Sequence, residues 1–161
     1  MILLIPLAAV AIAVRLVAGA LARRGRRAAE HWRSWPAAGA AGMAAVYVCT
    51  GVTHFVEPQR SGFAAIVPPM IPEPGLVVAA SGLAEFALAA GLTVPRTRRL
   101  AAVLSALFLI AVFPANVIAA GGVDHPAAPT TPLLPRALLQ LVFLGVSIAA
   151  VRAPRHRGRR D

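Results

Sequence analysis

Hydrophobic residues in this chain form long runs instead of the short amphipathic stripes of a soluble protein. Five runs of about 20 residues are separated by short polar connections, and they cover residues 2–22, 37–55, 75–94, 100–120 and 133–151. About 20 helical residues cross a hydrocarbon core of about 30 Å. Lipid offers no partner to an open strand, and the alternating segments of a membrane β-barrel are absent from the sequence. The pattern therefore predicts an all-α, polytopic transmembrane helical bundle.

Composition favours lipid as the solvent of this chain. Hydrophobic residues make up 58% of its 161 residues and charged residues only 14%, too few to cover a soluble globule. Every basic residue is arginine, and the net charge is +10. The arginines sit in short blocks at the ends of the apolar runs, without interleaved aromatic residues. This arrangement disfavours a nucleic-acid partner and favours a lipid bilayer.

The distribution of arginine also predicts an orientation. The first and third connections and the C-terminal tail are rich in arginine, whereas the second connection has only Arg60 and the fourth has none before Arg136. The positive-inside rule then places the N-terminus outside and the C-terminus in the cytoplasm. A cleaved signal peptide is the alternative for the first run, but arginines follow that run instead of preceding it, which is the reverse of a signal's charge order.

The second connection, residues 56–74, is unusual because it is both apolar and rich in proline. Five prolines, among them Pro68 and Pro69, exclude a continuous helix. We expect a short interfacial helix around residues 59–66, followed by an extended proline segment that folds back over the bundle. A loop lying on the lipid headgroups is the alternative.

Five side chains within or at the ends of the runs are costly to place in lipid, and they are Arg15, His54, Glu85, Asn116 and Gln140. Such residues face the bundle interior and find partners there. In the predicted orientation the last four lie in the outer half of the membrane, with Glu85 about 15 Å deep. They predict a shared polar pocket open to the external face. Hydrogen bonding from helix to helix is the alternative, and Asn116 and Gln140 alone would favour it.

Four further features bear on this pocket. Arg15, about 20 Å deep, could snorkel to the membrane edge or pair with Glu85. Pro114 should kink its helix and free the carbonyl of Ile110. Hydroxyl side chains within the runs carry little information, because they can bond to their own helix. Cys49 is the only cysteine, so we expect a small buried hydrophobe and neither a disulfide nor a metal site.

Six segments in order resemble the DoxX family of small bacterial integral membrane proteins. They are GVTHFVEP (51–58), IVPPMIPEP (66–74), SGLAEFALAAGL (81–92), PRTRRLAA (95–102), VFPANVIAA (112–120) and LPRALLQ (134–140). The resemblance implies a four-helix membrane domain over residues 37–151. An extra N-terminal transmembrane helix and its basic connection (1–36) would precede it, and a basic cytoplasmic tail (152–161) would follow. The residues that the resemblance singles out are His54, Pro68, Pro69, Glu85, Pro114 and Asn116.

Some DoxX relatives are linked to thiosulfate:quinone oxidoreduction or to thiol and oxidative-stress systems. The resemblance implies an accessory subunit of the bacterial cytoplasmic membrane that binds a small molecule, a quinone or a lipid, and supports a redox partner protein. A quinone-linked oxidoreductase and a carrier of protons or small solutes through the Glu85 pocket are the alternatives, and a homo-oligomer stays open. The sequence has no motif for haem, flavin or a nucleotide and no cysteine pair, so no catalytic residue is assigned.

Overall fold

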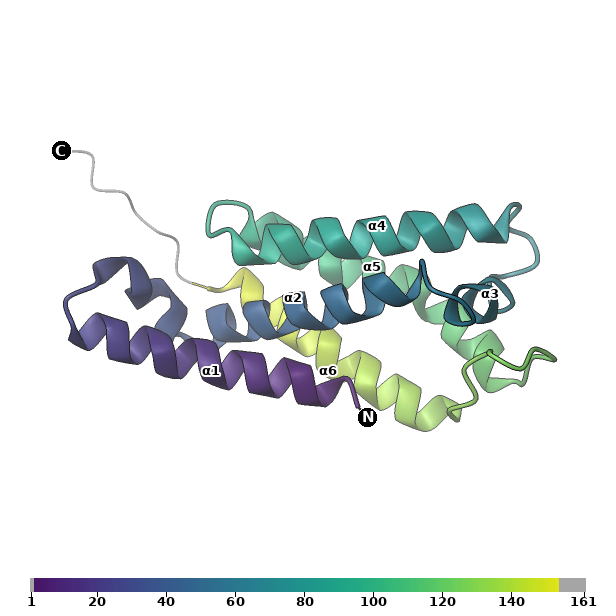
Figure 1. The fold of residues 1–161 in the computed structure, drawn as a ribbon, viewed down its shortest axis with the longest axis horizontal. Helices are drawn as coiled ribbons and strands as arrows, with labels where there is room; N and C mark the ends of the chain where they lie inside the picture. Colours follow the sequence, from purple (N-terminus) through teal and green to yellow (C-terminus); the bar gives the residue numbers. More distant parts are fainter. Residues whose placement is uncertain (1, 154–161) are drawn as a thin grey trace.

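The protein, as a computed structural model, is described here for residues 2–153, and every regular element in that part of the chain is a helix. Five long helices run back and forth along the molecule (Figure 1): α1 (Leu4–Arg23), α2 (Trp35–Thr53), α4 (Pro74–Thr93), α5 (Arg98–Ala120) and α6 (Leu133–Val151). A 3-10 helix, η1 (Arg27–Arg33), joins α1 to α2, and the short helix α3 (Gln59–Ala64) follows α2. The all-α class is confirmed.

All five long helices are apolar and long enough to cross a bilayer, so the chain is a multi-pass membrane protein. Their ends lie within two residues of the predicted runs. The start of α2 shows why small differences arise. Ser34 accepts a hydrogen bond from the backbone N–H of Ala37 at 3.3 Å, and Pro36 occupies the first turn. This N-cap begins the helix two residues before the apolar run does.

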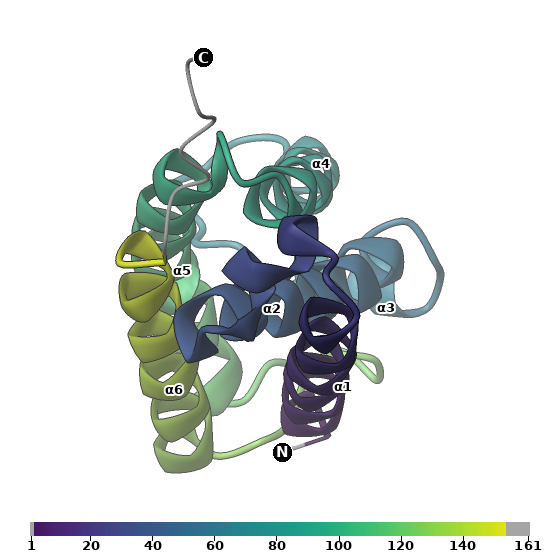
Figure 2. The same ribbon diagram turned by 90° about the vertical axis from the view of Figure 1, so that its left-hand side faces the viewer.

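Helix α2 lies at the centre of the bundle and is the most buried of the five (Figure 2). It contacts α1, α4 and α6, and α5 contacts α4 and α6. Helix α1 packs mainly against α2 and η1, and a Cβ at Gly42 would lie 2.3 Å from the carbonyl oxygen of Leu7. The two backbones therefore touch at this point. The division into a four-helix domain and one extra helix stays a prediction.

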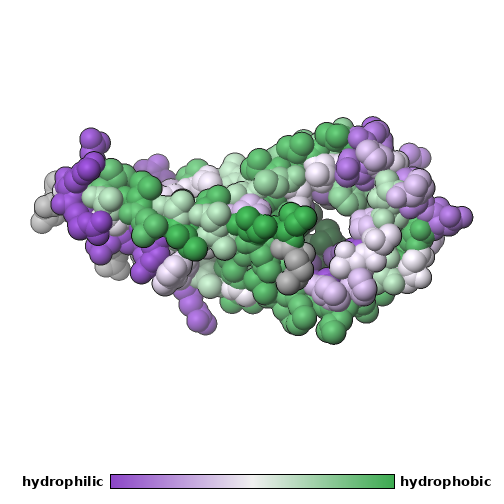
Figure 3. Space-filling model, turned by 60° about the horizontal axis from the view of Figure 1, so that its bottom comes forward, coloured by the Kyte–Doolittle hydropathy of each residue, from purple (hydrophilic) through white to green (hydrophobic). Residues whose placement is uncertain are grey.

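Both ends of the molecule are hydrophilic, and a hydrophobic belt separates them (Figure 3). The arginine-rich end holds the α1–η1 connection, the turn between α4 and α5, and the end of α6. Here Arg98 is buried, donates from Nε to the carbonyl oxygen of Leu92 at 3.0 Å, and stacks on the ring of Trp32 at 4.1 Å. Arg98 thereby caps the last turn of α4. The predicted tail arginines 155, 157, 159 and 160 lie outside the described residues.

The opposite end, called the loop end below, is formed by α3 and the connection 121–132. A small cluster there joins Ile66, which follows α3, to Ala119 near the end of α5 and to Ala128 of the connection. The expected short helix is present as α3, and its place at the membrane interface stays a prediction. The proline segment after it does not fold back over the bundle as expected: Pro68 is half-buried and residues 69–74 are exposed. Its exposed position beyond the bundle agrees with the alternative of a loop that would lie on the lipid headgroups.

Candidate functional site

A cavity of about 360 Å³ lies between α2, α5 and α6, near the loop end, where Figure 3 shows the molecule hollowed. Glu85 of α4 forms part of one wall, and α3 and the connection 121–132 contribute to the rim. Four of the five costly polar residues line it: His54, Glu85, Asn116 and Gln140. The structure therefore brings side chains from four helices around one space. Most of the remaining lining is apolar.

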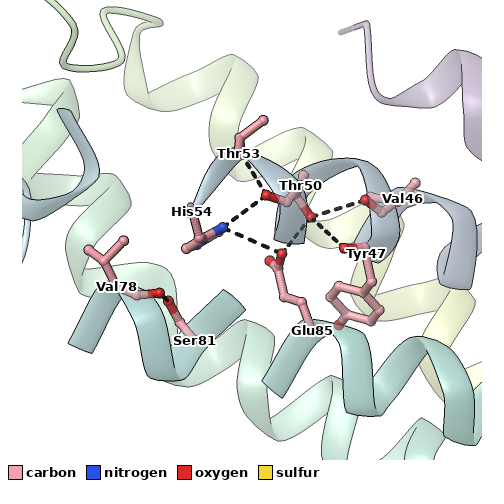
Figure 4. Close-up of polar contacts among 8 residues, drawn as sticks. All are labelled: Val46, Tyr47, Thr50, Thr53, His54, Val78, Ser81 and Glu85. Carbon is pink, nitrogen blue, oxygen red and sulfur yellow. Dashed lines mark hydrogen bonds and ion pairs between the residues drawn. The ribbon is translucent and has the colours of Figure 1, made fainter. Parts of the chain in front are cut away.

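Glu85, Thr50 and His54 form the inner wall of this cavity (Figure 4). The Thr50 hydroxyl lies 2.7 Å from Glu85 Oε2, and His54 Nδ1 lies 3.7 Å from the same oxygen. His54 Nδ1 also lies 2.9 Å from the carbonyl oxygen of Thr50, a contact that requires the proton on Nδ1 because a carbonyl only accepts. The second ring nitrogen of the neutral tautomer is then an acceptor. Glu85 is only 8% exposed.

The Thr50 hydroxyl has a choice of partners that depends on the protonation of Glu85. Its oxygen also lies 3.0 Å from the carbonyl oxygen of Val46, and one hydroxyl proton cannot serve both acceptors. If Glu85 is ionised, Thr50 donates to the carboxylate. If Glu85 is protonated, it can donate to Thr50, whose own proton then goes to Val46. The wall can therefore hold either form of the carboxyl group.

Glycines bring the two helices of this wall together. A Cβ at Gly82 of α4 would lie 2.7 Å from the Cβ of His54, and one at Gly51 of α2 would lie 2.9 Å from the ring of Phe86. Any larger residue would push the helices apart. Small residues at helix crossings are a general feature of membrane bundles, because they let the backbones approach closely. This close approach places Glu85 within reach of Thr50.

The sequence did not single out a row of hydroxyl groups beside the cavity. Tyr47 lies 2.6 Å from Ser105, and Ser105 lies 2.8 Å from Ser147, measured between the hydroxyl oxygens. All three side chains are at most 2% exposed. The row links α2, α5 and α6. Hydroxyls of this kind were expected to bond to their own helices, and only their rotational position in the bundle reveals that they meet.

Arg136 is the second feature that the sequence did not single out. Near the start of α6, it donates from Nη1 to Asn116 Oδ1 at 3.2 Å and from Nε to the carbonyl oxygen of Thr131 at 2.6 Å. Its Nη2 is buried and has no partner within the described part of the chain. One turn further on, Gln140 donates to the carbonyl oxygen of Leu109. The spacing of four residues between Arg136 and Gln140 was the available signal, since it puts both on one helix face.

Arg15 does not line this cavity, and of the two possibilities left open for it, snorkelling to the membrane edge or pairing with Glu85, the structure does not show the pairing. Its guanidinium donates to the carbonyl oxygen of Arg33 and stacks on the ring of Trp35 at 4.2 Å. The cause is the stagger of the first two helices. Because α2 starts level with Arg15, α1 extends well beyond it at the arginine-rich end. Arg15 therefore lies beside the start of α2, toward the arginine-rich end, and not at the level of Glu85.

The prolines that the sequence singled out and the cysteine also lie away from the cavity lining. Pro114 is on the exposed side of α5, and the carbonyl of this helix that accepts from Gln140 is that of Leu109. Pro68 and Pro69 precede α4 at the loop end. Cys49 is exposed on the outer face of α2, so the expectation of a buried cysteine is wrong. In lipid, this face meets acyl chains.

A larger hollow of about 820 Å³ lies on another side of the bundle, between α1, α2 and α4. Its lining is almost entirely apolar, with Val14, Ala45 and Phe86 as examples and Thr93 as a polar exception at its edge. It carries none of the polar groups that would orient a ligand. Lipid chains alone would fill such a groove.

Comparisons with known proteins give one match. Residues 43–155 match a family described as a domain of unknown function, DUF8561. The matched stretch runs from within α2 to beyond the end of α6 and includes His54, Glu85, Asn116, Arg136 and Gln140. Helix α1, η1 and the first part of α2 lie outside it. No curated protein and no solved structure matches the chain.

Proposed function

Since the chain belongs to the family described as a domain of unknown function, DUF8561, its activity must be inferred from its site, and we propose that it binds a small amphiphilic molecule, a quinone or a lipid. The observation that carries this proposal is the gathering of Glu85, His54, Asn116 and Arg136 around one cavity of about 360 Å³. Ligand sites commonly have volumes of about 300–1,000 Å³ and apolar walls with a few polar groups. This cavity has both properties.

The wider proposal concerns the setting of this binding step. The protein would be an accessory subunit in the cytoplasmic membrane of a bacterium, with its N-terminus outside, supporting a redox partner protein as the DoxX resemblance implies. The clustering of arginine at one end of the bundle supports this orientation. The cavity would then lie in the outer half of the bilayer, where membrane-dissolved ligands reach it from the side or from the external face.

Mass spectrometry of the gently extracted native protein tests ligand binding. We expect a defined adduct on the parent protein and about a tenfold or greater loss of occupancy in Glu85→Leu and Glu85→Gln, because a bond to a charged group contributes about 1.5–3 kcal/mol. Glu73→Gln is the matched control, since it changes an exposed carboxylate at the start of the same helix. A copurifying redox protein would support the wider proposal.

Two results would refute the binding proposal. One is a parent protein that carries no adduct and takes up no added quinone or lipid in the cavity. The other is a Glu85→Leu protein that is as stable as the parent and binds the same ligand equally well. In that case the polar groups serve only to fasten the helices.

Proton carriage is the second candidate, and the buried hydroxyl row favours it. The row runs from Tyr47 through Ser105 to Ser147, which lies about one turn from the arginine-rich end of α6. Glu85, which can hold or release a proton, lies on the cavity side. Proteoliposomes with the protein alone should then show proton flux, and Tyr47→Phe should reduce it severalfold. Equal flux in both proteins, or none in the parent, would count against a carrier.

A further inference from the structure

We propose that the cavity selects an acidic amphiphile, and that Arg136 binds its carboxylate or phosphate head at the loop end of the cavity. This inference rests on the proposed binding function and names the class of ligand. Arg136 lies three residues inside α6 and so about 5 Å from its loop end, whereas Glu85 lies about 15 Å from the loop end of α4. The positive and negative groups of the cavity are therefore at different depths.

The hydrogen bonds of Arg136 leave part of its guanidinium unused. Nε and Nη1 are occupied by Thr131 and Asn116, while Nη2 is buried without a partner among the described residues. Because Arg136 itself lines the cavity, a small rotation of the guanidinium would present Nη2 to an oxygen that enters there. Asn116 adds another donor, since its Oδ1 accepts from Arg136 and its amide N–H groups remain.

Charge favours an anion over a neutral head. The basic neighbour of Glu85 on the inner wall is His54, whose Nδ1 lies 3.7 Å from Oε2, and Arg136 forms no ion pair with any acidic side chain in residues 2–153. A guanidinium cannot lose its proton, so its charge within the membrane needs a counter-ion. The planar fork of arginine fits the paired oxygens of a carboxylate or phosphate. A ligand head would supply the missing negative charge.

The walls next to Arg136 favour an amphiphile over a free ion. Leu109, Leu139 and Phe143 line the same cavity, the last two one and two turns further along α6, and they offer nothing to a hydrated anion. A hydrocarbon tail that packs on these side chains would leave its head at Arg136.

The test compares the binding of laurate with that of its methyl ester, which has the same hydrocarbon tail but no charge. Protein in phosphatidylcholine nanodiscs is titrated with each, and occupancy is read by native mass spectrometry. The parent should bind laurate about tenfold or more tightly than methyl laurate. Arg136→Gln should remove this preference, and Arg136→Lys should keep part of it because its charge stays. Arg60→Gln, which changes an exposed arginine of α3 at the same end, should behave as the parent.

The outcomes separate the head-group proposal from the binding function. Equal binding of laurate and methyl laurate by the parent, unchanged in Arg136→Gln, would overturn the acidic head while leaving an amphiphile site in place. If Arg136→Gln does not fold, equal laurate affinities of Arg136→Lys and the parent would overturn it as well. Displacement of laurate by millimolar inorganic phosphate would show a soluble anion as the ligand and overturn the amphiphile. Binding of no amphiphile at all would refute the proposed function itself.

Discussion

The contact between α3 and the connection 121–132 gives the sharpest prediction about the loop end. Gly62 packs so closely on this connection that an added Cβ would lie 2.1 Å from the carbonyl oxygen of Ala127 and 2.6 Å from its carbonyl carbon. Both atoms are backbone and cannot turn aside as a side chain could. Gly62→Ala must therefore shift α3 or the connection by about 1 Å to restore van der Waals contact.

The expected cost of Gly62→Ala is about 1–3 kcal/mol, the range for an extra methyl group forced into a packed site. Alanine's better helix propensity offsets up to about 1 kcal/mol of this. The shift should also reach the cavity, because the same connection carries Thr131, whose carbonyl oxygen accepts from Arg136. Ligand occupancy should therefore fall together with stability.

Unfolding titrations in SDS, performed for both proteins in the same lipid–detergent mixture, would measure the change. Gly75→Ala is the control, since the space around Gly75 is open and it too lies at the loop end, in the first turn of α4. We expect the free energy of unfolding to fall for Gly62→Ala and to stay level or rise for Gly75→Ala. Two variants of equal stability would refute the close packing of α3 on the connection.

Two further predictions concern the first helix and the orientation. Gly42→Ala should lower the free energy of unfolding by about 1–3 kcal/mol, because its Cβ would meet the backbone of α1. In the same SDS titration Gly145→Ala should have little effect, because the space around Gly145 is open. In a Cys49→Ser background, Met70→Cys should react with an impermeant thiol reagent applied outside intact cells. Arg24→Cys should react only after the cells are lysed. The opposite labelling pattern would show that the predicted orientation is reversed.

Most of the fold could be predicted from the sequence because lipid imposes strong constraints. The thickness of the bilayer sets helix length, so the five spans were located within two residues. The cost of polar groups in lipid similarly pointed to His54, Glu85, Asn116 and Gln140, which do surround one cavity. A polar side chain in an apolar run has few options other than the bundle interior. The position of these four side chains inside the bundle could therefore be predicted from the free-energy cost of polar groups in lipid alone.

The remaining features depend on how helices are rotated and staggered, which a single sequence does not reveal. Arg15 was placed close to the level of Glu85 because its depth was counted along its own run, while the stagger of α1 against α2 puts it beside the start of α2. Arg136 was counted as a charge near a helix end, and only packing shows that it faces the cavity. Tyr47 and Ser105 meet because of the relative rotation of α2 and α5.

Photo-crosslinking with peptide mapping tests most directly whether the cavity between α2, α5 and α6 binds an amphiphile. The protein in nanodiscs is irradiated with a fatty acid that carries a diazirine on its tail, with and without excess unlabelled laurate. The expected result is saturable labelling at Leu109, Leu139 and Phe143, suppressed by the competitor. Labelling confined to the groove between α1, α2 and α4, at Val14 and Phe86, and unaffected by the competitor would contradict the account.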